Sequence, residues 1–197
     1  MATRTIGIVL AACAFATLTA HAQTSVRIRG TITAVDATTL SVKSREGRDV
    51  KLALPDNATV AVAKAASIGD LKDGDFVGVT TRPGPGGGEV AIEVHYLPPT
   101  AAAGQSAWDL VPNSKMNNAR IEGKVAASGA HELTLALPGG AQKIVVPEGT
   151  PIVRSVPGTR ADLVPGEYVF IGAQASGDGA ITALRIQVSK DGVRPPQ

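Results

Sequence analysis

The clearest pair of side chains with chemical potential in this sequence is Glu93 and His95, which stand two positions apart. Side chains along a β-strand repeat every two residues, so a strand here would place both on one face. Carboxylate and imidazole groups are ligands for Zn²⁺, and a zinc site needs three or four ligands. The matching positions later in the chain, Arg185 and Gln187, add none. The pair therefore predicts only the first two ligands of a metal site, and no cofactor is expected.

A second group of polar and aromatic side chains lies near the middle of the chain. The only Trp, Trp108, is followed by Asp109, Asn113 and Asn117. Trp is enriched at the centre of binding surfaces, so an indole beside amides and a carboxylate could hold a ligand or a partner. The other interpretation is structural, because Trp and Met fill irregular apolar gaps well. In that case a connecting segment is held across two domains by Trp108, Leu110 and Met116.

Signals for catalysis and for phosphate binding are weak. The sequence contains no Gly-x-Ser-x-Gly motif, and no spacing marks two carboxylates as an acid and a base. The Gly-rich run 83–88 lacks the Gly-Lys-Ser/Thr ending of a phosphate-binding loop, so it indicates a hairpin loop. A glycan-acting enzyme stays open as a third alternative, because carboxylates distant in sequence can meet in space.

Composition and charge exclude several classes of protein. The 197 residues carry 19 Lys and Arg against 17 Asp and Glu, a net charge of +2, whereas a dedicated nucleic-acid binder shows a basic excess. The first half does contain a basic patch, made of Arg27, Arg29, Lys43, Arg45, Arg48 and Lys51. Only Phe76 and Tyr96 could stack on bases beside it, so nucleic acid is not expected as a partner. A hydrophobic fraction of 44% is enough for a globular core.

The first 22 residues have the layout of a secretory signal peptide. The basic Arg4 precedes an apolar stretch over residues 6–16, and Ala20-His21-Ala22 supplies small residues for cleavage after Ala22. The apolar stretch is too short to span a bilayer, which needs ~20 apolar residues. The alternative is a lipoprotein, because Leu10-Ala11-Ala12-Cys13 is similar to a lipobox whose Cys13 is acylated. The sequence predicts a periplasmic protein with no transmembrane segment.

The remainder of the chain reads as one unit that occurs twice. Short motifs recur in the same order, among them Asp70-Leu71 with Asp162-Leu163, and Gly74-Asp75-Phe76-Val77 with Gly166-Glu167-Tyr168-Val169. In each unit apolar and polar residues alternate, which is typical of strands with one buried face. Three strands, a fourth short run, a helical turn capped by Ser67 and two more strands match the order of an OB-like small β-barrel.

We therefore predict an all-β protein of two tandem OB-like small β-barrels after an N-terminal signal peptide. The expected boundaries are a signal peptide at 1–22, a first barrel unit at 23–98, a structured linker at 99–118, a second barrel unit at 119–190 and a C-terminal tail at 191–197. Each unit is close to the lower size limit for a stable core. The two units are therefore expected to pack together as an intramolecular pseudo-dimer.

The whole chain after residue 22 resembles a family of small exported proteobacterial proteins of unknown function. Four features carry the resemblance. They are the signal peptide, the Arg-x-x-Gly strand entry at Arg27–Gly30 and Arg120–Gly123, the Asp-Leu-x-x-Gly-x-x-Val turn and strand at Asp70–Val77 and Asp162–Val169, and the linker at Trp108–Ala119. The resemblance implies a periplasmic β protein and supplies no activity.

The function we expect is binding or scaffolding in the cell envelope, with a protein or glycan partner and without catalysis. The expected binding residues are Trp108, Asp109, Asn113 and Asn117. The alternative is a periplasmic metal-binding accessory protein, for which Glu93 and His95 would be the first ligands.

Overall fold

The structure is a computed structural model that describes residues 23–127 and 129–197. The described part is all β, as the alternation of apolar and polar residues predicts. Its strands are β1 (Thr24–Val35), β2 (Thr39–Ser44), β3 (Asp49–Ala53), β4 (Thr59–Ala66), β5 (Phe76–Pro83), β6 (Glu89–Tyr96), β7 (Gly104–Ala107), β8 (Lys115–Ala127), β9 (Ala130–Leu137), β10 (Gly140–Pro147), β11 (Ile152–Pro157), β12 (Tyr168–Ala175) and β13 (Ile181–Val188). Short 3-10 turns occur at η1 (Ile68–Asp70), η2 (Pro85–Gly87) and η3 (Arg160–Asp162). The predicted signal peptide and Cys13 lie outside the described residues.

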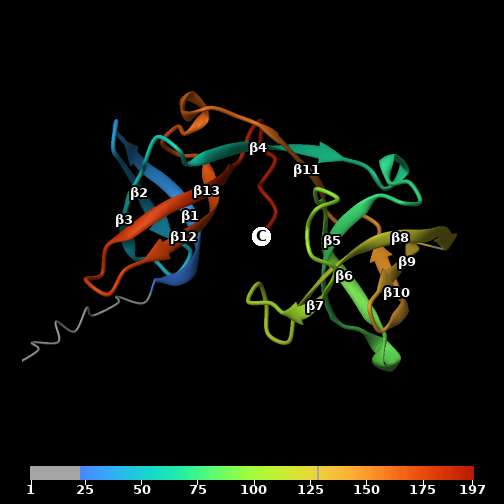
Figure 1. Ribbon diagram of the computed structural model, residues 1–197. Coiled ribbons are helices and arrows are strands. Elements are labelled where there is room, and N and C mark those ends of the chain that lie inside the picture. The colour runs from blue at the N-terminus through green and yellow to red at the C-terminus, as the bar shows by residue number, and fades with distance from the viewer. Residues whose placement is uncertain (1–22, 128) are drawn as a thin grey trace, which may run out of the picture.

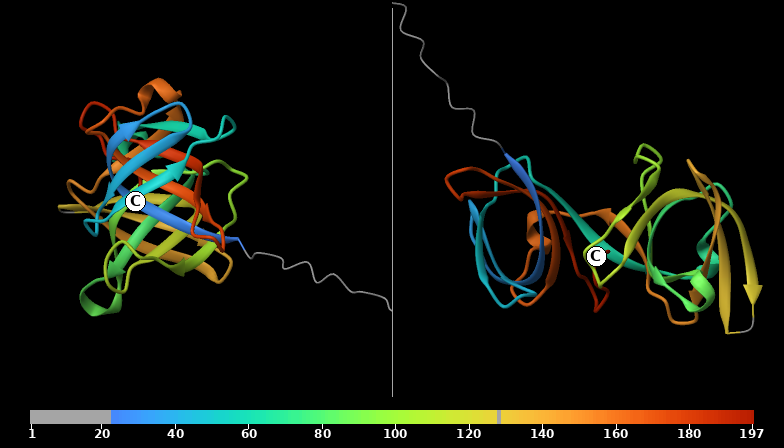
Figure 2. Two further views of the ribbon diagram at one scale, coloured as in Figure 1. Left: turned by 90° about the vertical axis from the view of Figure 1, so that its left-hand side faces the viewer. Right: turned by 90° about the horizontal axis from the view of Figure 1, so that it is seen from below.

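The strands form two barrel-like lobes that stand side by side (Figures 1 and 2). In the first lobe β1 pairs with β2 and β12, β2 with β3, and β12 with β13, and the pair Thr182–Ala53 joins β13 back to β3. In the second lobe β8 pairs with β9 and β5, β9 with β10, and β5 with β6, and Ile144 joins β10 back to Glu89 of β6. Each lobe therefore closes on itself with five strands. The described residues include no helix that is long and apolar enough to cross a membrane.

Each lobe takes strands from both halves of the chain, which differs from the predicted arrangement of one barrel per half. Strand β1 pairs with β12, from the far end of the sequence, rather than with β5. Strand β5 pairs instead with β8. The predicted units 23–98 and 119–190 thus each supply strands to both lobes. The physical reason is that the starts of β5 and β12 have nearly the same residue pattern, so either can satisfy the edge of β1 or of β8.

Strands β4 and β11 carry the chain from one lobe to the other. They pair with each other in antiparallel register from Ala61–Pro157 to Ala66–Ile152. On its other edge β4 pairs with β13 of the first lobe, and β11 pairs with β6 of the second lobe. This crossed pair makes the two sheets continuous, so backbone hydrogen bonds fix the position of one lobe against the other (Figure 1).

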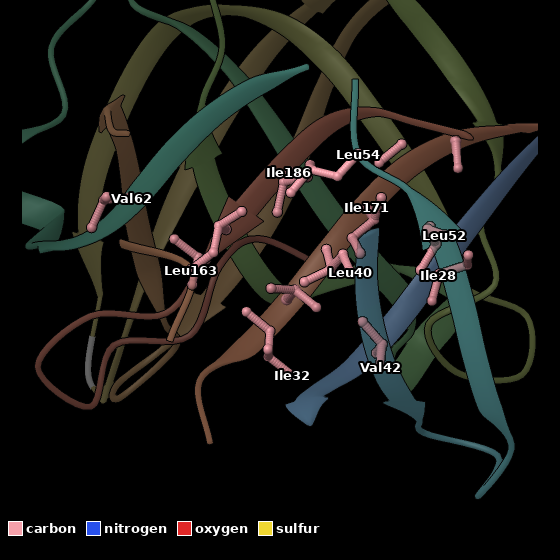
Figure 3. Packing of buried hydrophobic residues seen from close by; sticks show 14 residues of the cluster. Ile28, Ile32, Leu40, Val42, Leu52, Leu54, Val62, Leu163, Ile171 and Ile186 are labelled. Atoms are coloured by element: carbon pink, nitrogen blue, oxygen red, sulfur yellow. The ribbon is translucent and has the colours of Figure 1, made fainter. Parts of the chain in front are cut away.

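Each lobe has its own hydrophobic core. The first core contains Leu40 and Leu52, which are completely buried, together with Ile171 and Ile186 from the C-terminal half (Figure 3). The second core is centred on Leu133, Leu135, Ile144 and Val79. Both cores mix strands of the two halves, so neither half of the chain could bury its apolar face alone in this arrangement.

The turns before β5 and β12 are built alike and lock onto the other half of the chain. The expected cap of the first turn is confirmed, since Ser67 is the N-cap of η1 and its backbone N–H donates to Asp70 at 2.8 Å. After η1, Gly74 N–H donates to the carbonyl of Ile121. After η3, Gly166 N–H donates to the carbonyl of Ile32.

These contacts make Ile32 the counterpart of Ile121, which corrects the predicted alignment of Arg27–Gly30 with Arg120–Gly123. Ile32 pairs with Val42 across its hairpin, whereas Ile121 pairs with Leu135, so the second hairpin is four residues longer. The two Arg-x-x-Gly motifs therefore occupy different places in their barrels.

Candidate functional site

The only Trp of the chain sits at the start of a tight loop, residues 108–114, which we call the Trp108 loop. It follows β7 and leads into β8, so it belongs to the second lobe. The Ser114 hydroxyl donates to carbonyls on both sides of the loop, at 2.9 Å to Trp108 and 2.7 Å to Val111. Asn113 has a φ of 60°, a conformation that Asn tolerates better than most residues. The predicted binding residue Asn113 thus shapes the loop through its backbone.

The Trp108 loop is tied to the first lobe by Asp109. Both carboxylate oxygens of Asp109 accept from the Arg29 guanidinium, at 3.0 and 2.8 Å, and Arg45 donates to the Asp109 carbonyl at 2.9 Å. Arg29 is only 3% exposed. Hydrogen bonding to Arg29 lowers the pKa of the Asp109 carboxyl, and burial opposes the shift less strongly. Asp109 therefore anchors the loop in its ionised form, which Arg29 stabilises.

The indole of Trp108 faces the arginines of β1. The Arg27 guanidinium lies 4.3 Å from the ring centroid and that of Arg29 lies 5.7 Å away. Arg29 also lies 4.9 Å from the ring of Phe170 on β12. Cation–π contacts of this kind are stronger when water is excluded. Asp109 therefore neutralises part of the charge of the basic patch predicted from the sequence. The first two residues of the patch, Arg27 and Arg29, contact the aromatic surface made by Trp108 and Phe170.

A hollow of about 420 Å³ opens beside this aromatic surface. Its walls come from β1, β12, β13 and the Trp108 loop, and include Arg27, Trp108, Phe170, Arg185 and Gln187. Aromatic rings with a few convergent polar groups are typical of binding sites. The hollow has two cations in its wall and no carboxylate, so it favours a ligand with acceptor oxygens.

Glu93 and His95 lie on the second lobe, and each is less than 10% exposed. His95 Nδ1 is 3.3 Å from Glu93 Oε1 without a hydrogen bond of good geometry. The ring lies against Gly78 of β5, where an added Cβ would be 2.4 Å from His95 Nε2. The structure brings the two predicted ligands together, as the strand period requires. Within residues 23–127 and 129–197, however, no third His, Cys, Asp or Glu completes a metal-binding group.

The last residues of the sequence return along the space between the two lobes, where Figure 1 marks the C end. After β13 the chain reverses at Asp191-Gly192, both with positive φ, and Lys190 and Val193 pair across this turn. Asp-Gly is a preferred sequence for such a two-residue turn. Residues 194–197, here called the terminal segment, then follow, with Pro195 and Pro196 buried.

The terminal segment joins the two groups of predicted site residues into one site. The Gln197 backbone N–H lies 3.0 Å from both carboxylate oxygens of Glu93, and the Gln197 carbonyl accepts from Trp108 Nε1 at 2.8 Å. The guanidinium of Arg194 lies 4.6 Å from the ring centroid of Tyr168. We call the space bounded by Glu93, Trp108 and the terminal segment, together with the hollow of about 420 Å³ that shares Trp108 in its wall, the interlobe groove. No sequence motif pointed to residues 194–197; the Asp191-Gly192 turn signal was the one available clue.

Asn117, the fourth predicted binding residue, lies outside the interlobe groove and is completely buried. Its amide nitrogen donates to the Val79 carbonyl and to Thr81 Oγ1, both at 3.0 Å, and its Oδ1 accepts from Gln105 at 2.7 Å. These bonds hold β7, β8 and β5 together. Asn117 therefore has a structural role, because it stabilises the strands that carry the Trp108 loop.

Comparison with known proteins adds a partial assignment. No curated protein and no solved structure gave a significant match to the chain. One family model matches, a domain of unknown function (DUF5666), over residues 29–95. This match begins at Arg29 of β1 and ends at His95 of β6, so it includes one anchor from each side of the interlobe groove. Residues 29–95 of this chain are thus similar to the domain of unknown function DUF5666, and the strands of this stretch are divided between the two lobes.

Proposed function

We propose that this chain is an exported binding protein of the cell envelope that holds a partner in the interlobe groove and performs no catalysis. The support for export is the Arg4, apolar run and Ala20-His21-Ala22 pattern at the start of the sequence. A periplasmic location follows from that pattern. The partner class is a protein or a glycan, since both present the carbonyl and hydroxyl oxygens that an arginine-lined aromatic surface can bind.

The observation that carries the proposal is the placement of Trp108. The Arg29–Asp109 ion pair fixes the loop from the second lobe against β1 of the first lobe. The indole is thereby held beside Arg27, with its N–H directed into the groove. A rigid aromatic anchor binds at low entropic cost, because little side-chain freedom remains to be lost. The β4–β11 pair keeps the opposite wall in place.

The experiment that tests this proposal compares groove variants with a matched surface variant. The immobilised chain is exposed to an envelope extract, and the bound proteins and glycans are identified. We expect Arg27→Ala with Trp108→Phe to lose the components that the natural chain retains. Val125→Ser, an exposed apolar position at the far end of β8, is expected to retain them. Components bound equally by all three chains would show that the groove is not the site.

A further inference from the structure

Residues 194–197 lie in the interlobe groove in the manner of a bound peptide. Both hydrogen-bonding groups of the Gln197 backbone have a partner in the groove wall, the N–H in Glu93 and the carbonyl in Trp108 Nε1. Contacts to backbone groups recognise an extended chain whatever its side chains are. An indole N–H that donates to a ligand carbonyl, beside buried prolines, is the chemistry by which aromatic-lined grooves hold proline-rich segments.

The two prolines explain why this segment can be buried at all. A buried backbone N–H without a partner is costly, and proline has none. Proline also restricts the free segment to extended conformations, so less entropy is lost when it docks. Arg194, on the side toward the turn, lies over the Tyr168 ring, which gives the segment a direction in the groove.

The terminal segment is also attached so that it can leave without unfolding a lobe. It follows an exposed two-residue turn, and none of residues 189–197 belongs to either hydrophobic core. A hollow of about 500 Å³ runs beside it, lined by Glu93, Pro151 and Val153 of the second-lobe side and by Pro195 and Gln197. The groove is therefore wider than its present occupant.

We propose that the interlobe groove is a docking site for an extended, proline-containing peptide segment of a partner protein, and that residues 194–197 occupy it as a self-ligand. This rests on the proposed function and names its partner class. A tethered self-ligand acts at a high effective concentration, in the millimolar range for a short connection. The natural chain then binds an external peptide weakly, in proportion to the fraction of molecules whose groove is free.

The test uses the full chain and a labelled peptide, Lys-Asp-Gly-Val-Arg-Pro-Pro-Gln, which has the sequence of residues 190–197. Binding is followed by fluorescence anisotropy. Replacing both prolines of the chain, Pro195→Gly with Pro196→Gly, weakens the self-ligand and leaves the groove unchanged. We expect this variant to bind the peptide at least tenfold more tightly than the natural chain does. A peptide with both prolines replaced by Gly is expected to bind neither chain.

Two further chains make the result specific to the groove. Adding Trp108→Phe to the proline variant removes the indole N–H but keeps a ring, and should weaken peptide binding about threefold to tenfold, the worth of one hydrogen bond. Adding Val125→Ser instead should change nothing. Thermal melts of all chains verify folding.

The proposal is overturned if the folded proline variant binds the peptide no better than the natural chain does. It is equally overturned if Trp108→Phe leaves binding unchanged, or if a glycan fragment occupies the groove and the peptide does not. In those cases the proposed function still stands provided that the Arg27 and Trp108 variants lose their envelope components. Both proposals fall together only if those variants retain them.

Discussion

Replacement of Asp109 by Asn tests whether the Trp108 loop is anchored to the first lobe by charge. The change keeps the size of the side chain and removes the anion that faces Arg29 at 2.8 and 3.0 Å. Arg29 is 3% exposed, and its Nε has no hydrogen-bond partner in the described structure. Asp109→Asn therefore leaves the buried Arg29 guanidinium without a counter-charge, whereas the half-exposed side chain at position 109 stays hydrated.

The expected cost lies between two limits. Removing one partner of a fully buried ion pair costs roughly 3–5 kcal/mol, and an exposed pair is worth about 0.2–1 kcal/mol. The Asp109 side chain is 50% exposed, so water replaces part of what it supplies. We expect a loss of about 2 kcal/mol in the free energy of unfolding, which for a protein of this size lowers Tm by roughly 4–8 °C.

Thermal melts at pH 7 followed by near-ultraviolet circular dichroism measure this change, and the matched control is Asp49→Asn in the exposed pair with Lys43. The pH dependence gives an independent readout. Because the pKa of Asp109 is lowered by folding, its contribution is complete above the unfolded pKa, near 4, and is lost as the pH falls through the folded pKa. The Tm values of the natural chain and of Asp109→Asn, plotted against pH, should therefore converge at acid pH. A Tm for Asp109→Asn equal to that of the control would refute the anchoring role.

Other predictions test the strand exchange, the glycines and the metal alternative. Gly30→Ala should cost about 3 kcal/mol in unfolding measurements, since its Cβ would lie 2.1 Å from the Lys43 carbonyl oxygen, whereas Gly123→Ala, which meets nothing within 4 Å, should be tolerated. Leu40→Ala and Leu133→Ala should each lower the free energy of unfolding by roughly 2–5 kcal/mol. Calorimetry should show a single unfolding transition in both variants, because each core contains strands of both halves of the chain. Two separate transitions would contradict the exchange of strands. Zn²⁺ added after chelation should leave Tm unchanged in the natural chain and in His95→Ala. The reason is that Glu93 already accepts from Gln197 and that the described residues supply no third acidic, Cys or His ligand. A rise in Tm confined to the natural chain would restore the metal-binding role.

Local patterns in the sequence identify the elements of this fold but not their partners. The alternation at Leu40 and Val42, the cap at Ser67 and the all-β class could be predicted because each depends on neighbouring residues. Whether β1 pairs with β5 or with β12 depends on the path of β4, which no local pattern encodes. Gly30 and Gly123 likewise occupy different places in their barrels, because the β8–β9 hairpin is four residues longer than the β1–β2 hairpin and the short repeated motifs do not reveal this difference.

The candidate site was predicted in fragments for a related reason. The sequence predicts that Glu93 and His95 lie together, and they do, because two residues on one strand face need no tertiary information. Residue type alone marks Trp108 and Asp109 as binding candidates, and in the structure Trp108 lies in the groove whereas Asp109 anchors the loop. Trp108 is linked to Glu93 through Gln197, which is hydrogen-bonded to both residues. Gln197 lies 104 residues from Glu93 and belongs to no recognisable motif. Contacts of this range follow from the exchanged topology alone.

The exchange of strands also explains how a small protein with so few aromatic residues can present a firm groove. If each half closed on itself, two barrels joined by residues 99–118 could change their relative orientation, and a site between them would be ordered only on binding. Here β4 and β11 cross between the lobes as one hydrogen-bonded pair, and the ion pair of Asp109 with Arg29 adds a second tie between the lobes. Two attachments restrain rotation far better than one. The first-lobe wall that carries Arg27 and the second-lobe wall that carries Trp108 and Glu93 are thus held at a fixed spacing before any ligand arrives, which is the condition that a preorganised peptide groove requires.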